Sequence, residues 1–284
     1  MPYPILTLPY PFAQRLRQLL NPFELKQLQL AAGHNVINPL KPIVPSSKER
    51  ELYFIKNFNT DPDAIPTYDL YLGSHPTGLS QPMISIPKND KYLIKCLILR
   101  FYDMSHLALT SLNTDTLSIK PFRIDLDRCQ IRQAFLKTLS KLVIKPSQLC
   151  MWSSPDVDEG TTFSTILNIF PSVNSIAFAK SYFGWLSDLA STRRRFLAVD
   201  ILHHDVEKIF SFRPEELYSF VIEQHPQFRF HILVVTDDVD ATVKKIAPFI
   251  DPRFTCEKNG YLKFMLTVKN IMSRYQQEYY LKKI

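Results

Sequence analysis

Glycine is scarce in this chain. It occurs six times in 284 residues, whereas soluble proteins average about 7%. The patterns G-x-G-x-x-G and G-x-x-x-x-G-K-[ST] do not occur in the sequence. In those loops, backbone N–H groups approach nucleotide phosphates closely. Their absence argues against most ATP-, GTP- and NAD-dependent enzymes, and we expect no cofactor.

Closely spaced cysteines and long apolar runs are also missing. The four cysteines, Cys96, Cys129, Cys150 and Cys256, contain no Cys-x-x-Cys pair, which excludes a metal clamp or dithiol of that type and favours buried free thiols. No apolar run approaches the ~20 residues that cross a bilayer, and the N-terminus lacks a signal-peptide pattern. We therefore expect an intracellular protein, cytoplasmic or nuclear, with no membrane partner.

The excess of positive charge is spread along the chain. The formal net charge is +7, and the densest cluster is Arg193-Arg194-Arg195, which we interpret as a solvated turn or helix end. There is neither zinc-finger spacing nor an RNA-recognition pattern. Nucleic acid is therefore not an expected partner.

The N-terminus has the pattern of two short helices. Apolar residues recur at helical spacing at Phe12, Leu16, Leu19 and Leu20. Asn21 is then placed to cap a second helix, with Pro22 at its first position and Glu24 completing a capping box. A unit below roughly 40 residues seldom folds alone. Its apolar face must therefore pack on the rest of the chain or on another protein.

The sequence predicts three regions: a helical module with a Pro-rich connector over 1–45, a region of short strands over 46–120, and repeated strand–helix units over 121–284. Strand centres are predicted at Met151, Phe178, Val199 and Ile232, with spacings of 27, 21 and 33 residues. Uneven strand–helix units of this length favour an irregular leucine-rich-repeat-like domain. A doubly wound sheet is the alternative, although its usual glycine-rich turns are absent.

Two kinds of polar cluster are candidates for chemistry. His203-His204-Asp205 joins imidazoles to a carboxylate, but adjacent histidines point in different directions, and we interpret the segment as a polar loop. Carboxylates gather at 156–159 and 237–240, where helix capping explains them better than a hydrolase pair or a calcium loop. We expect no metal site and no catalytic residues.

Aromatic residues are abundant, and those near strand ends of a repeat array often line a binding face. We expect most of them to fill the core, with some exposed for protein recognition. The candidates are Tyr53, Tyr68, Tyr71, Trp152, Phe178, Tyr182, Phe183 and Trp185.

The N-terminal segment resembles an F-box. Leu8-Pro9, the leucines of the first helix and the step Asn21-Pro22-Phe23-Glu24-Leu25 are most similar to the large nematode F-box family, in which a leucine-rich-repeat-like associated domain follows. The resemblance is detailed over residues 3–30 and only architectural beyond them. Where that family has a third helix, residues 31–39 include Gly33 and Pro39, which predict a shortened one.

The resemblance implies an α+β protein: a small N-terminal helical F-box-like module followed by an irregular α/β leucine-rich-repeat-like domain. It implies a non-catalytic substrate-recognition subunit of a Skp–cullin–F-box ubiquitin ligase, whose second domain binds a target protein of unknown identity. The implied contacts with a Skp-type adaptor are Leu8, Pro9, Phe12, Leu16, Leu20, Pro22, Phe23 and Leu25. The first alternative is an interaction scaffold with a degenerate F-box. The second alternative is a hydrolase that uses Asp156 and Asp158 or His203 and His204.

Overall fold

The computed structural model describes residues 10–32, 40, 44–56, 68–72, 91–110, 112, 115–153, 157–249, 254–255, 264–270 and 276–281. The chain is a mixed α/β protein. It divides into a first compact unit, Met1–Ile124 with Ala134–Pro146, and a second, Asp125–Gln133 with Ser147–Ile284. The predicted limit at 45/46 lies inside the first unit, and the one at 120/121 lies near the break at 124/125; the three-region division stays a prediction.

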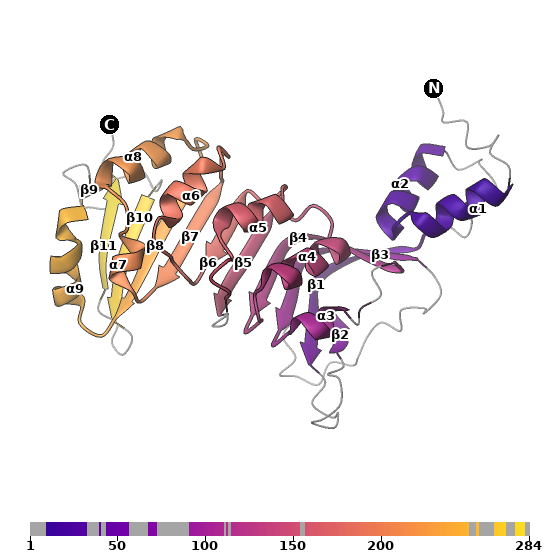
Figure 1. The fold of residues 1–284 in the computed structure, drawn as a ribbon, viewed down its shortest axis with the longest axis horizontal. Coiled ribbons are helices and arrows are strands. Elements are labelled where there is room, and N and C mark those ends of the chain that lie inside the picture. The colour runs from indigo at the N-terminus through magenta and orange to yellow at the C-terminus, as the bar shows by residue number, and fades with distance from the viewer. Residues whose placement is uncertain are drawn as a thin grey trace. The chain divides into compact units, whose positions relative to one another are not determined.

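The first unit begins with two helices, α1 (Tyr10–Leu19) and α2 (Pro22–Ala32) (Figure 1). Its strands are β1 (Ser46–Lys56), β2 (Tyr68–Leu72), β3 (Tyr92–Tyr102) and β4 (Leu117–Asp127), in the order β2-β1-β3-β4. Strand β1 is antiparallel to β2 and parallel to β3. The remaining helices are α3 (His106–Thr110) and α4 (Gln133–Leu142).

The second unit alternates strands with helices. Its elements in chain order are β5 (Gln148–Ser153), α5 (Phe163–Ile169), β6 (Ser175–Phe178), α6 (Trp185–Ser191), β7 (Ala198–His203), α7 (Val206–Ile209), α8 (Pro214–Glu223), β8 (Arg229–Thr236), α9 (Val239–Ile246), the 3₁₀ turn Ala247–Phe249, β9 (Phe254–Thr255), β10 (Phe264–Asn270) and β11 (Gln276–Leu281). The sheet order is β5-β6-β7-β8-β10-β11-β9, and the pairs from β5 to β10 are parallel. The parallel strands β5, β6, β7, β8 and β10 therefore follow one another across the sheet in chain order, and β9 lies at the edge beyond β11.

The two faces of this sheet differ in burial. In β7, Val199, Ile201 and His203 are buried, whereas the residues between them are only half-buried. Strand β8 alternates in the same way. Because successive side chains of a strand point to opposite faces, the buried set lies under the helices, which cover one face in Figure 1. We call the other, partly exposed face the open face.

Most sequence-predicted elements of the second unit are confirmed within a few residues, including the helices at 163, 183 and 214 and the strands at 148, 175, 198 and 229. The four predicted strand centres do not all pair with one another. Phe178 pairs with Ile201, not Val199, and Ile201 pairs with Ile232. The spacings are therefore 27, 23 and 31 residues.

Several elements escaped the sequence prediction. Strand β4 contains Pro121, and proline argues against a strand interior because it cannot donate to the ladder. The helices α3 and α7 have five and four residues, too short to show a helical period. The tyrosine-rich tail was not predicted as a strand, and it forms β11.

The predictions about the cysteines and about membrane-spanning segments can be compared with the structure. Cys96, Cys129 and Cys150 are buried free thiols, as predicted, and Cys256 lies outside the described residues. Within the described chain, no helix has both the length and the apolar character needed to cross a membrane.

Candidate functional site: the N-terminal module

The predicted capping box is present at the start of α2. The side chain of Asn21 accepts from the Glu24 backbone N–H at 2.9 Å, and the Glu24 carboxylate accepts from the Asn21 N–H at 3.0 Å. Pro22 occupies the first helical position, where its missing N–H costs no hydrogen bond. These three residues fix where α2 begins.

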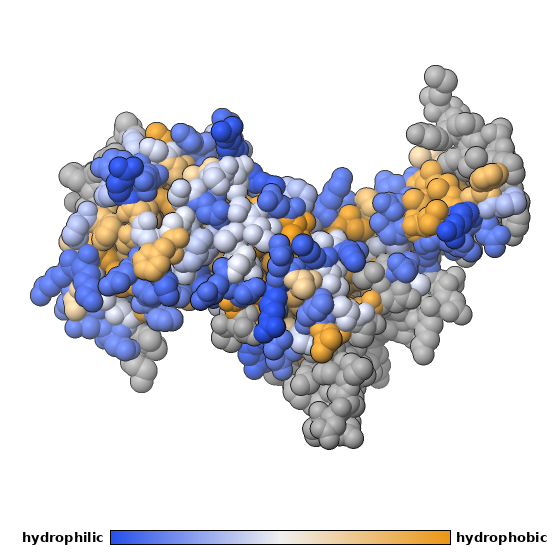
Figure 2. Space-filling model, viewed as in Figure 1, coloured by the Kyte–Doolittle hydropathy of each residue, from blue (hydrophilic) through white to orange (hydrophobic). Residues whose placement is uncertain are grey.

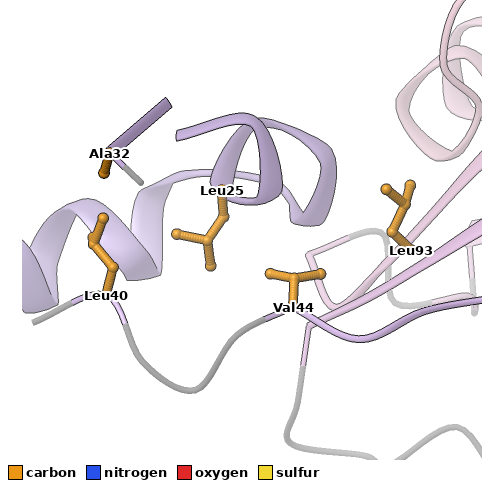
Figure 3. Packing of buried hydrophobic residues seen from close by; sticks show 5 residues of the cluster. All are labelled: Leu25, Ala32, Leu40, Val44 and Leu93. Carbon is orange, nitrogen blue, oxygen red and sulfur yellow. The ribbon is translucent and has the colours of Figure 1, made fainter. Parts of the chain in front are cut away.

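A small apolar cluster joins the two helices to the chain that follows them (Figure 3). Its buried members come from α2, from the connector and from β3: Leu25, Ala32, Leu40, Val44 and Leu93. Half-buried residues pack around it: Leu16, Leu20, Phe23, Leu28 and Ile144. We call α1, α2 and this cluster the N-terminal module. Part of the helices' apolar face is thus covered by the chain itself.

Polar side chains also attach the connector to the helices. Arg17 and Gln29 donate to the carbonyl of Leu40 at 2.8 and 2.7 Å. Lys26 donates to the carbonyl of Val44 at 3.0 Å, and the Val44 N–H donates to Gln29 at 2.9 Å. Because each bond satisfies a backbone group, Leu40 and Val44 are held against the two helices.

The end of α1 is capped by Lys91, which immediately precedes β3. The Lys91 ammonium donates to the carbonyls of Leu20 and Gln18, the latter at 3.2 Å. Burial lowers the pKa of Lys91. A cation at the C-terminal end of a helix interacts favourably with the carbonyls left without helical partners. Lys120 lies over the ring of Phe23, with its Nζ 5.5 Å from the ring centroid.

The residues predicted to contact an adaptor fall into distinct environments. Phe12 is 65% exposed, whereas Pro22 and Leu25 are buried in the module. The other three described positions are half-buried in the cluster: Leu16, Leu20 and Phe23. Leu8 and Pro9 lie outside the described residues.

Two exposed leucines were not in the predicted set. Leu19 is 66% exposed and Leu30 is 54% exposed. Phe12 and Leu19 are seven residues apart, so they lie on nearly the same side of α1. Figure 2 shows apolar surface over α1 and α2. The sequence signal for Leu19 was its place in the apolar period; its exposure depends on how the helices pack.

The candidate polar clusters serve as helix caps and loop contacts. Asp205 caps α7 by accepting from the N–H groups of Glu207 and Lys208, and Asp238 caps α9 by accepting from Ala241. The expectation that His203 and His204 point in different directions was wrong, because their rings stack with centroids 4.4 Å apart. Burial, then the neighbouring His204, lowers the pKa of His203.

The first carboxylate cluster differs from its prediction. Thr162, not an acidic residue, caps α5, Asp158 and Glu159 are exposed, and Asp156 lies outside the described residues. Over the described ranges, no three His, Cys, Asp or Glu side chains come close enough to hold a metal ion together.

The arginine cluster ends helix α6, as predicted. Arg194 donates to the carbonyls of Leu167 and Pro171, both at 2.9 Å, and so caps the C-terminal end of the neighbouring helix α5. Arg193 has a left-handed backbone with φ of 53°. This cluster therefore has a structural role between successive strand–helix units.

The predicted aromatics divide between core and surface. Tyr53, Phe178 and Trp185 are buried, and the Trp185 indole donates to the Ile209 carbonyl at 2.9 Å. The Tyr182 hydroxyl donates to Asp188 at 2.5 Å and accepts from the Phe163 N–H at 2.8 Å; burial, then the bond to Asp188, raises the Tyr182 pKa.

The other aromatics are less enclosed. Phe183 is 67% exposed, Tyr71 and Trp152 are half-buried, and the side chain of Tyr68 lies outside what the structure describes.

A second candidate site lies on the open face of the second unit. A hollow of about 260 Å³ is lined by Ala198, Asp200, Arg229, Phe230, His231 and Met265. None of these residues was predicted from the sequence to form a site.

No family model matches this sequence, and comparisons with curated proteins and with solved structures found no match.

Proposed function

We propose that the protein is the substrate-recognition subunit of a Skp–cullin–F-box ubiquitin ligase. In this proposal the N-terminal module binds a Skp-type adaptor, the adaptor connects it to a cullin scaffold, and the second unit binds a target protein. The chain itself performs no chemistry, and ubiquitin transfer is done by other subunits.

The observation that carries the proposal is the exposed apolar side of α1. Phe12 and Leu19 are each about two-thirds exposed on one side of that helix, next to the half-buried Leu16 and Leu20. Large exposed apolar groups that cluster on a small helical element are typical of protein-binding sites. In this proposal Pro22 and Leu25, which are buried, stabilise the module itself. The residues that contact the adaptor directly are Phe12, Leu19 and Leu30.

The arrangement of the second unit supports an irregular leucine-rich-repeat-like domain. Its parallel strands follow one another in chain order, with 27, 23 and 31 residues between paired positions. Such repeats contact their neighbours in sequence and leave one strand face available for binding. We therefore propose the open face as the side that receives the target.

The adaptor proposal predicts the effect of charges on α1. In full-length protein, Phe12→Asp with Leu19→Asp should weaken binding to a purified Skp-type adaptor at least about a hundredfold, because central apolar contacts are each worth about 2 kcal/mol or more. Calorimetry or co-elution measures this loss. These positions are preferable to Leu16 and Leu20, whose replacement would disrupt the module's own cluster.

The matched control adds the same charge to the opposite side of α1. Gln14 and Gln18 are exposed and lie away from Phe12 on the helix. Gln14→Asp with Gln18→Asp should keep adaptor affinity within about threefold, as expected for surface changes. Monodisperse wild-type protein that does not bind the adaptor would rule out the F-box proposal.

One observation favours the scaffold alternative. The cluster formed with Leu40, Val44 and Leu93 already covers Leu16, Leu20 and Phe23 in part, which leaves fewer apolar groups for an adaptor. A protein that binds its target but no adaptor would act as an interaction scaffold. The adaptor titration separates the two functions directly.

A further inference from the structure

The hollow on the open face lies across three adjacent strands of the second unit. Asp200 on β7 is opposite His231 on β8, and His231 is opposite Met265 on β10. Ala198 is opposite Arg229 one step along the same face. The lining residues other than Phe230, which belongs to the buried set of β8, therefore come from two consecutive rows of the open face.

The size of the hollow limits what it can hold. Pockets for drug-sized molecules and cofactors measure about 300–1,000 Å³, whereas this one measures about 260 Å³. Its volume suits one side chain and part of the backbone on each side. A segment bound there can continue over the neighbouring row of the open face, where Leu202 and Leu233 are paired and half-buried.

Among the described residues that line the hollow, the cationic side chain is Arg229. It is exposed, and within the described chain its guanidinium makes no ion pair or hydrogen bond to another side chain. His231 bonds Thr267 through Nε2 at 3.1 Å, and burial lowers the His231 pKa against the opposing effect of Glu278. The imidazole is therefore neutral at pH 7, and the positive charge belongs to Arg229.

The other groups suit the remainder of an extended peptide. Asp200 is half-buried on the β7 side, and a carboxylate has lone pairs for several donors, including the backbone N–H groups of a bound segment. Met265 and Ala198 supply apolar contact. A planar guanidinium binds a carboxylate through two parallel hydrogen bonds.

We propose that this hollow binds an acidic side chain of an extended peptide segment, with Arg229 binding its carboxylate and Asp200 accepting from its backbone. The inference rests on the proposed function for the identity of that peptide as part of a target protein. The proposed target proteins are those with a segment in which Glu or Asp stands beside apolar residues.

A titration of full-length protein with blocked pentapeptides tests this. The probe has a central glutamate between leucines, and the comparison peptides carry glutamine, lysine or phosphoserine instead. NMR signals of the Arg229 Nε–H and the His231 ring report on binding. We expect saturable shifts with the glutamate peptide and at least about tenfold weaker binding with the glutamine peptide, since hydrogen bonds between two charged groups are stronger than those to a neutral amide.

Variants at one position provide the controls. Arg229→Gln should abolish the preference for glutamate, whereas Arg128→Gln, an exposed arginine elsewhere in this unit, should retain it. Arg229→Glu should reverse the preference toward the lysine peptide. Thermal unfolding confirms that each variant is folded.

Three results would overturn the inference. They are equal binding of the glutamate and glutamine peptides, stronger binding of phosphoserine, and binding of N-acetylglutamate as tight as that of the pentapeptide. Adaptor binding is measured on the same Arg229→Gln protein, where we expect no change. If the protein binds the peptide but not the adaptor, the ligase proposal is rejected and the peptide-binding proposal is retained. If it binds the adaptor but not the peptide, the peptide-binding proposal is rejected and the ligase proposal is retained.

Discussion

At the scale of single residues, the scarcity of glycine affects the backbone directly. Among the residues that the structure describes, four that are not glycine have left-handed φ angles: Asp103, Arg128, Lys145 and Arg193. Arg193 follows the C-cap of α6, the position at which helices most often place glycine. A side chain there costs roughly 1–2 kcal/mol. The backbone at Arg193 is therefore strained, and glycine at this position would relieve the strain.

Arg193→Gly should stabilise the protein by about 0.5–1 kcal/mol. The relief of strain exceeds the roughly 0.5–1 kcal/mol that glycine loses through its freer unfolded chain. Chemical denaturation measures the change. Arg195→Gly is the matched control, since Arg195 has no positive φ, and it should give no gain. Equal effects of the two substitutions would contradict the argument.

At the scale of elements, local signals predicted what they directly encode. The capping box of Asn21 and Glu24 was predicted from spacing alone and is present. Strand β4 was missed because Pro121 interrupts its pattern. Hydrogen bonds to the adjacent strand β3 hold it in the sheet, and the local sequence does not record them. The candidate site follows the same rule: the apolar period of α1 was visible, but the division into exposed Phe12 and half-buried Leu16 depends on distant residues such as Leu93.

Asn21→Ala should loosen α2. Loss of the cap costs about 1 kcal/mol, which corresponds to roughly fivefold faster hydrogen exchange where α2 opens locally. Mass spectrometry of the α2 amides measures it. Asn21→Asp keeps an accepting oxygen and should exchange nearly as slowly as wild type. If both variants exchange equally fast, the cap does not stabilise this helix.

At the scale of the whole molecule, the chain divides into two compact units. Compact units of this kind can unfold separately, and we expect the two to do so. Both tryptophans of the sequence, Trp152 and Trp185, belong to the second unit. Tryptophan fluorescence therefore reports on one unit, while far-UV circular dichroism reports on both.

Leu99→Ala should separate these two signals. Leu99 is fully buried in the first unit, and its truncation costs about 2–5 kcal/mol. In a urea titration, part of the circular dichroism change should move to lower urea while the tryptophan transition stays in place. Ile201→Ala, in the second unit, should shift the tryptophan transition instead. Parallel shifts of both signals in Leu99→Ala would show a single cooperative unit.

The sequence by itself determined part of the local structure: most helices and strands of the second unit, the cap of α2, and the carboxylate cap of α9 at Asp238. These features depend on residues a few positions apart. The tertiary structure decided which apolar side chains stay exposed on α1 and that Asp200, Arg229 and His231 line one hollow. The physical reason is that strand pairing joins residues about thirty positions apart, such as Asp200 and His231, and neither periodicity nor spacing records that register.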